Sequence, residues 1–266
     1  MKCFSIDLDG TLLNSKHEIS DENLKVLRYL EERGHSIIFN TGRAFEDVIK
    51  YDSVRKIEAP VFSINGTVLY SKSREILFEA SLPVSTYKEL FQVLKKLGLW
   101  VMVYTNQGGF PCRYPMLAGK SVEEIERIFD SYDYNEVLEK ENLKIYKVMA
   151  VTREDQLDKI DQAKQEVAGK LEVSMASSFP NNVEFTSIEA TKGKALLRYQ
   201  TMTNIQFDEI YAFGDGGNDI AQFKVATTSV AMGNAPSFIQ QEADMITKSN
   251  DEDGFAYAVR QLLKIE

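Results

Sequence analysis

Short apolar runs alternate with helical segments at both ends of the chain. Near the start, strands are predicted at 4–6, 36–40 and 61–64, with helices between them. The end repeats this order, with helices predicted over 194–199, 218–223 and 255–263 and strands over 209–213 and 229–232. Because continuous apolar strands separated by helices are typical of a parallel sheet covered on both faces, the two ends together predict an α/β fold.

The middle of the chain, about residues 84–186, has a different pattern. Strands are predicted at 100–104, 145–151, 171–175 and 183–185, and helices at 86–97 and 155–167. Ser121-Val122-Glu123-Glu124 has the spacing of a helix-starting capping box. We therefore predict a Rossmann-like parallel-sheet core formed by residues 1–83 and 187–266, with an inserted α+β domain at 84–186.

Composition excludes several classes of function. The 266 residues carry a net charge of −9, which disfavours nucleic acid and anionic membranes as partners because both need a positive surface. No apolar run approaches the length of a membrane span, and the first residues lack a signal peptide, so we expect a cytoplasmic protein. With two cysteines and two histidines, neither a disulfide framework nor a cysteine–histidine zinc site is expected.

Four polar turns each follow a predicted strand. They are Asp7-Leu8-Asp9-Gly10-Thr11, Thr41-Gly42-Arg43, Asn65-Gly66 and Gly214-Asp215-Gly216-Gly217-Asn218-Asp219. Open α/β sheets build their sites at the carboxyl ends of the strands, so these turns are expected to meet at one edge. Four carboxylates would gather there, those of Asp7, Asp9, Asp215 and Asp219.

This arrangement predicts phosphoryl transfer. Four crowded carboxylates repel one another unless a cation lies among them, and oxygen ligands favour Mg²⁺. The glycines allow backbone N–H groups to approach an anion, and the helix predicted from Asn218 would add a favourable dipole. Either Asp7 or Asp9 could then attack phosphorus as a carboxylate nucleophile.

These turns, with Lys192, resemble the four ordered motifs of the haloacid dehalogenase-like (HAD) phosphohydrolases. The size and place of the insert are similar to the Cof-type branch, which carries a C2-type cap. The resemblance implies that Asp7 is the nucleophile and that Asp9 is the general acid and base. It implies Mg²⁺ ligands at Asp7, the main-chain carbonyl of Asp9, Asp215 and, through water, Asp219. It also implies phosphate or substrate contacts at Thr41, Gly42, Arg43, Asn65, Gly66, Lys192 and Asn218.

The resemblance leaves several points open. Lys194 lies close to Lys192, so the motif lysine is favoured at 192 without being fixed there. The expected activity is Mg²⁺-dependent hydrolysis of small phosphomonoesters, sugar phosphates first, under a cap that excludes water and selects the leaving group. A sugar phosphomutase and a slow-turnover protein that binds a phosphorylated metabolite are the alternatives. Both a specialist and a broad phosphatase fit the motifs, and we expect a monomer or a small homo-oligomer.

Overall fold

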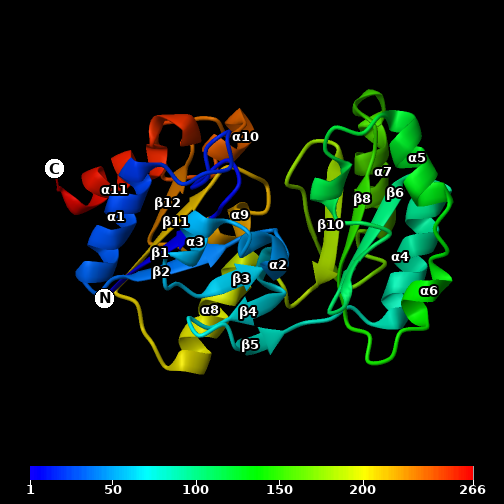
Figure 1. The fold of residues 1–266 in the computed structure, drawn as a ribbon, viewed down its shortest axis with the longest axis horizontal. Helices are drawn as coiled ribbons and strands as arrows, with labels where there is room; N and C mark the ends of the chain where they lie inside the picture. The colour runs from blue at the N-terminus through cyan, green and yellow to red at the C-terminus, as the bar shows by residue number, and fades with distance from the viewer. Residues whose placement is uncertain (266) are drawn as a thin grey trace. The chain divides into compact units, whose positions relative to one another are not determined.

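The computed structural model describes residues 1–265, and the chain divides into two compact units. Unit 1 comprises Met1–Glu79 and the chain from Ala190 onward, and unit 2 comprises Ala80–Glu189. The chain thus leaves unit 1, builds unit 2 and returns (Figure 1).

Unit 1 is built on an eight-stranded sheet with the order β13-β12-β11-β1-β2-β3-β4-β5. Its strands are β1 (Lys2–Ile6), β2 (Ser36–Asn40), β3 (Val61–Ser63), β4 (Val68–Tyr70), β5 (Ile76–Glu79), β11 (Glu209–Gly214), β12 (Thr228–Ala231) and β13 (Met245–Ile246). The six strands from β13 to β3 are parallel, and β4 and β5 extend the sheet antiparallel. Strand β1 lies between β11 and β2, which places its carboxyl end beside theirs.

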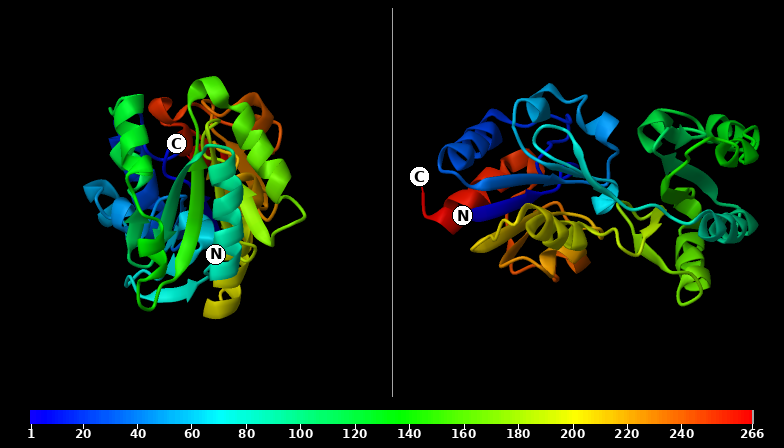
Figure 2. Two further views of the ribbon diagram at one scale, coloured as in Figure 1. Left: turned by 90° about the vertical axis from the view of Figure 1, so that its right-hand side faces the viewer. Right: turned by 90° about the horizontal axis from the view of Figure 1, so that it is seen from below.

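Helices cover both faces of this sheet. They are α1 (Asp21–Glu32), α2 (Phe45–Val48), α3 (Asp52–Arg55), α8 (Lys192–Thr203), α9 (Ile220–Phe223), α10 (Ser237–Gln240) and α11 (Gly254–Leu263). Apolar residues of α1 and α11 pack in one core cluster, whereas those of α8 pack in another on the opposite face. Figure 2 (right) shows α8 in yellow and α1 in blue on opposite sides of the sheet. The two faces are both apolar, as the continuous strands predict.

Unit 2 is an α+β unit with a five-stranded antiparallel sheet in the order β7-β6-β8-β10-β9. Its strands are β6 (Trp100–Thr105), β7 (Gly108–Phe110), β8 (Ile145–Val151), β9 (Val173–Ala176) and β10 (Asn182–Ser187). Its helices are α4 (Val84–Lys96), α5 (Val122–Asp130), α6 (Asn135–Leu138) and α7 (Asp158–Val167). Helices α4 and α7 pack on the sheet through a core that includes Leu90, Ile160 and Phe185.

The α/β class is confirmed, and the structure differs from the sequence prediction in detail. The helix predicted over 218–223 is shortened to α9, four residues that begin after Asp219, so its dipole at the site is small. The hairpin of β4 and β5 is not predicted, because its strands are only three and four residues long. Among residues 1–265, no helix is both long and apolar enough to cross a membrane.

Candidate active site

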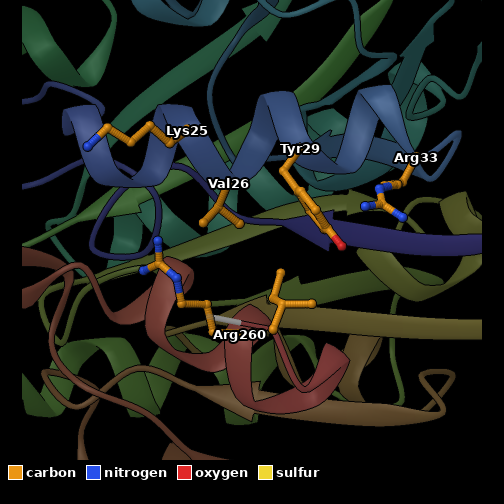
Figure 3. Close-up of a pocket in the computed structure, with 6 residues that line it drawn as sticks. Lys25, Val26, Tyr29, Arg33 and Arg260 are labelled. Atoms are coloured by element: carbon orange, nitrogen blue, oxygen red, sulfur yellow. The ribbon is translucent and has the colours of Figure 1, made fainter.

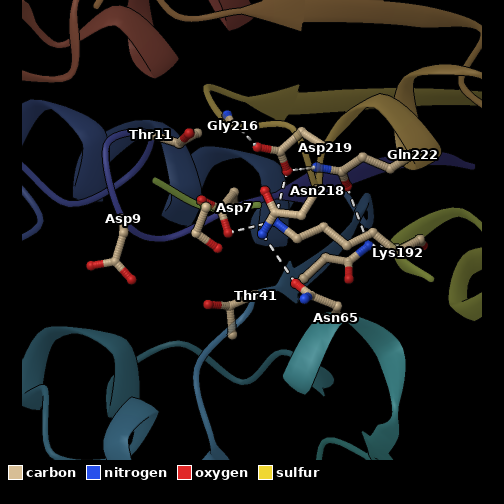
Figure 4. Close-up of polar contacts among 12 residues, drawn as sticks. Asp7, Asp9, Thr11, Thr41, Asn65, Lys192, Gly216, Asn218, Asp219 and Gln222 are labelled. Atoms are coloured by element: carbon tan, nitrogen blue, oxygen red, sulfur yellow. Dashed lines mark hydrogen bonds and ion pairs between the residues drawn. The ribbon is translucent and has the colours of Figure 1, made fainter. Parts of the chain in front are cut away.

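The four polar turns meet at the carboxyl ends of adjacent parallel strands. Asp7 follows β1, Thr41 follows β2, and Asp215 follows β11. Asn65 follows β3 in a short 3₁₀ turn, Ile64–Gly66. Since β11, β1, β2 and β3 are consecutive neighbours in the sheet, their turns form one polar cluster (Figure 4). This is the edge at which the sequence predicts the site.

A buried lysine ties two of these turns together. Lys192 is the first residue of α8, and Thr191 caps that helix by accepting a hydrogen bond from the Lys194 N–H. The ammonium of Lys192 is fully buried and lies 2.7 Å from Asp7 Oδ1 and 2.6 Å from Asp219 Oδ1 (Figure 4). A buried charge is stable only when it is paired, and here one ammonium is shared between two carboxylates.

The carboxylate of Asp219 is fully occupied by donors. Its Oδ1 accepts from Lys192 and, at 2.7 Å, from Gln222 Nε2. Its Oδ2 accepts from the backbone N–H groups of Asp215 (3.0 Å) and Gly216 (2.9 Å). Asp219 therefore fixes the shape of its own turn and the position of the lysine, and it would reach a cation through an intervening water.

Burial and crowding shift the charges in this cluster. Burial raises the pKa of Asp7 well above its ordinary value, an effect that Lys192 opposes and that the neighbouring aspartates reinforce. Burial, with the charge of Asp219, raises the pKa of Asp215 to about 7. Burial lowers the pKa of Lys192, but Asp219 and Asp7 outweigh it and raise that pKa overall. The raised pKa values show that one lysine does not compensate the ionised forms of all these carboxyl groups, so a bound cation would favour their ionisation.

The carboxylates of Asp7, Asp215 and Asp219 fit a metal ion. Each places one oxygen within 4.8 Å of the others. Thr11 Oγ1 donates to Asp215 Oδ1 at 3.1 Å, which orients that carboxylate. Asp215 also packs directly on Gly10, where an added Cβ would lie 2.2 Å from Asp215 Oδ2 and where φ is +68°. An all-oxygen donor set with excess negative charge suits a hard cation such as Mg²⁺.

Asp9 lies outside this group of three and is bound by Arg43. The guanidinium donates from Nε and from Nη2 to the two carboxylate oxygens of Asp9, a two-pronged ion pair. Arg43 is largely buried, and its guanidinium lies 5.1 Å from the centre of the Tyr51 ring. Arg43, in the turn after β2, therefore contacts Asp9, in the turn after β1.

The other predicted binding residues surround the cluster. Asn218 Nδ2 donates to Asn65 Oδ1 at 3.0 Å. The Asn65 N–H donates to the Thr41 carbonyl at 2.9 Å, which ties the second and third turns. Gly66, with φ at +84°, packs so closely on α8 that an added Cβ would lie 2.7 Å from the Thr191 carbonyl oxygen. Gly42 lies between Thr41 and Arg43 in the same turn.

Several polar residues beside the turns lie outside the set of residues predicted for the site. Asn234 Nδ2 donates to the Gly10 carbonyl at 2.8 Å and so holds the first turn. Ser5, Asn40 and Gln222 are buried behind the turns and bond to one another. Ser5 and Asn40 are polar residues within otherwise apolar strands next to a motif, and that position is the signal that could have identified them.

A separate hollow lies between α1 and α11 (Figure 3). It is lined by Lys25, Val26, Tyr29, Arg33, Arg260 and Ile265. None of the predicted site residues lines it, and Arg260 is paired there with Glu22. The polar cluster at the strand ends is therefore the candidate active site.

Comparison with known proteins agrees with the motifs. A family model of haloacid dehalogenase-like hydrolases matches residues 4–259. The chain belongs to the haloacid dehalogenase-like hydrolase family. The HAD resemblance is thus confirmed across almost the whole chain.

Two curated relatives and one solved structure are similar to this chain over almost its whole length. The HAD chain is 30% identical to the phosphatase YwpJ of Bacillus subtilis, over 99% of this chain and 100% of that protein. It is 27% identical to the B. subtilis 5-amino-6-(5-phospho-D-ribitylamino)uracil phosphatase YwtE, over 99% of this chain and 98% of that protein. A haloacid dehalogenase-like hydrolase from B. subtilis matches the fold with a TM-score of 0.86 at 27% identity, covering 98% and 100% of the two chains. This HAD protein is an enzyme, a phosphoric monoester hydrolase.

Proposed function

We propose that this HAD phosphatase hydrolyses small phosphomonoesters with Mg²⁺ through an aspartyl-phosphate on Asp7. One observation carries the proposal: the buried Asp7 carboxylate is held at Oδ1 by Lys192, and a second carboxylate, Asp215, lies within metal-binding reach. A carboxylate with one oxygen fixed by a cation is oriented for attack through the other.

In the first step, Asp7 Oδ2 attacks phosphorus. A bond forms between this oxygen and phosphorus, the bond from phosphorus to the leaving oxygen breaks, and its electron pair goes to that oxygen. Asp9 gives a proton to the departing oxygen. In the second step Asp9 takes a proton from water, and the water oxygen attacks phosphorus. The bond between phosphorus and Asp7 Oδ2 breaks, its electron pair returns to the Asp7 carboxylate, and inorganic phosphate leaves.

The phosphoryl group would be held by the turns after β2, β3 and β11 and by the start of α8. We assign its contacts to side chains and amides that already lie in the cluster: Thr41, Gly42, Arg43, Asn65, Gly66, Lys192 and Asn218. Lys192 is fully buried and is held in place by its ion pair with Asp7. Its positive charge would therefore already be in position to stabilise the phosphoryl oxygens when negative charge moves to them from Asp7.

The ion would be held by Asp7, the main-chain carbonyl of Asp9 and Asp215, with Asp219 acting through water. When bound, Mg²⁺ would offset the carboxylate charge and polarise the phosphoryl group. The saturated hydrogen bonding of Asp219 supports its indirect role, because both of its oxygens already accept two hydrogen bonds.

We propose a small phosphorylated metabolite as substrate, with sugar phosphates as the first class to examine. A relative that covers the whole chain is named as a phosphatase of a phosphoribitylamino compound, whose phosphate is carried on a sugar-derived chain. We propose that unit 2, Ala80–Glu189, is the C2-type cap that the sequence predicts over residues 84–186. The cytoplasmic location and the oligomeric state stay predictions.

The test is release of inorganic phosphate from a panel of phosphate esters with Mg²⁺, using the wild type, Asp7→Asn and Asp9→Asn. We expect the wild type to release phosphate, and we expect the rate of release to fall at least about 100-fold in each variant. Wild-type turnover in either variant would refute the assigned roles. Stoichiometric release of phosphate excludes a phosphomutase, and tight binding without turnover would favour a regulatory protein.

A further inference from the structure

Three buried neutral residues lie directly behind the candidate site. Ser5 is on β1 two residues before Asp7, Asn40 is the last residue of β2, and Gln222 is on α9 three residues after Asp219. Ser5, Asn40 and Gln222 are each completely buried. Ser5 Oγ donates to Gln222 Oε1 at 2.7 Å, and Asn40 Nδ2 lies 3.2 Å from both Ser5 Oγ and Gln222 Oε1.

This buried amide network, defined by Ser5, Asn40 and Gln222, reaches the reacting groups through two further hydrogen bonds. Gln222 Nε2 donates at 2.7 Å to Asp219 Oδ1, the same oxygen that accepts from Lys192 (Figure 4). Asn40 Nδ2 donates at 3.0 Å to the main-chain carbonyl of Lys192. The network therefore holds both the helix end that carries the lysine and the carboxylate that orients its ammonium.

The network also joins four segments that are far apart in the sequence. It bonds the ends of β1 and β2 to α9, and it bonds β2 to the start of α8. Helices α8 and α9 approach so closely that a Cβ on Gly193 would lie 2.1 Å from the Ala221 carbonyl oxygen. Because the backbones are in contact there, the network has little freedom to rearrange.

We propose that Gln222 and Asn40, together with Ser5, are positioning residues for the reaction at Asp7. This inference rests on the proposed function, since it gives the three residues behind the site a role in that reaction. A neutral amide holds Asp219 without adding charge to the crowded cluster, whereas a carboxylate at 222 would repel it. The network keeps the Lys192 ammonium between Asp219 and Asp7, and this fixes the oxygen that Asp7 presents to phosphorus.

A purely structural role makes a different prediction. Replacing the three side chains together by apolar groups of similar shape removes the bonds among them at a smaller cost to stability than removing one partner alone. Such a replacement still removes the donors to Asp219 Oδ1 and to the Lys192 carbonyl. Stability and catalysis should therefore separate in a variant that removes the whole network.

The experiment compares the wild type, Gln222→Met, and the triple variant Ser5→Ala/Asn40→Leu/Gln222→Met, by thermal unfolding and by kcat and KM for p-nitrophenyl phosphate with Mg²⁺. We expect folded variants whose kcat falls about 10- to 100-fold while KM changes less than about threefold, as for a displaced catalytic group. Wild-type kcat in a folded triple variant would overturn the proposal. If the triple variant does not fold, wild-type kcat in Gln222→Met overturns it.

Asn23→Ala is the matched control. Asn23 is also buried and polar in unit 1, but its Oδ1 accepts from the Ala256 N–H, joining α1 to α11. We expect this variant to lose stability and to keep kcat per folded molecule. Failure of the proposed function is distinguishable, because the wild type would then release no phosphate and would match Asp7→Asn.

Discussion

The guanidinium of Arg43 donates to both carboxylate oxygens of Asp9. The pair links the turn after β2 to the turn after β1, and it holds the aspartate to which we assign proton transfer. Two-pronged pairs of arginine with carboxylate fix geometry as well as charge, which a lysine cannot reproduce. For Asp9 to exchange a proton with the leaving group, at least one of these two hydrogen bonds must open.

We therefore predict that Arg43→Lys weakens proton transfer selectively. A misoriented Asp9 matters most when the leaving oxygen is strongly basic, so kcat/KM should fall about tenfold more for an alkyl phosphate than for p-nitrophenyl phosphate. Steady-state rates on the two esters provide the measurement. Arg55→Lys, at an exposed pair with Asp52, is the control and should leave both rates unchanged. Equal losses on the two esters would contradict an effect through Asp9.

The raised pKa of Asp215 predicts how stability depends on pH in the metal-free protein. Its pKa rises from 3.8 to about 7 on folding, so the folded state holds this proton more tightly than the unfolded state. The contribution to stability is complete below pH 3.8 and is lost as pH rises through about 7. With a chelator present, the melting temperature should fall between pH 5.5 and pH 8.

Mg²⁺ should reverse this loss, because the ion binds the deprotonated carboxylate. The stabilisation by Mg²⁺ should be larger at pH 8 than at pH 5.5. Asp215→Asn should reduce the pH slope, leaving the part that comes from the raised pKa of Asp7, and should weaken the response to Mg²⁺. The surface variant Asp52→Asn is the control and should keep both. A pH slope in Asp215→Asn equal to that of the wild type would show that other groups cause it.

The close approach of α8 and α9 predicts the effect of one added methyl group. A Cβ on Gly193 would lie 2.1 Å from the Ala221 carbonyl oxygen, so one backbone must move. We expect Gly193→Ala to cost about 1–3 kcal/mol of stability and to lower kcat by displacing Lys192.

Gly34→Ala is a control of comparable stability cost. Gly34 has φ at +71°, where an alanine is strained by about 1–2 kcal/mol, but an added Cβ would meet nothing within 4 Å. Thermal unfolding and kcat per folded molecule, measured for both variants, separate the two effects. Normal kcat in Gly193→Ala would show that the start of α8 tolerates displacement.

Much of the fold and the place of the site follow from local sequence pattern. Ser121 begins α5 as its capping-box spacing predicts. The turns beginning at Asp7 and Gly214 lie at one sheet edge because parallel strands leave that topology little choice. The antiparallel hairpin of β4 and β5 is not predicted, since strands of three and four residues carry too little pattern to be recognised.

What the sequence could not reveal is pairing across long separations. The sequence pattern places Asp9 and Arg43 in neighbouring turns. Whether the two side chains meet depends on their conformations in the folded protein, which the spacing of the residues in the sequence does not determine. Gln222 looks like an ordinary residue of a short helix until the fold brings it to Asn40 and Asp219. The shortening of α9 likewise follows from Asp219, whose side chain binds the backbone of its own turn in place of a longer helix.

The covalent state of Asp7 tests the central claim most directly. The enzyme is mixed with p-nitrophenyl phosphate and Mg²⁺, quenched in acid during turnover, and digested for mass spectrometry of the peptide that contains Asp7. We predict that this peptide gains one phosphoryl group at Asp7, that the modification is sensitive to hydroxylamine, and that Asp7→Asn abolishes it. Turnover with an unmodified Asp7 peptide at every quench time, or a phosphoryl group on another residue, would contradict the assignment of Asp7 as the nucleophile.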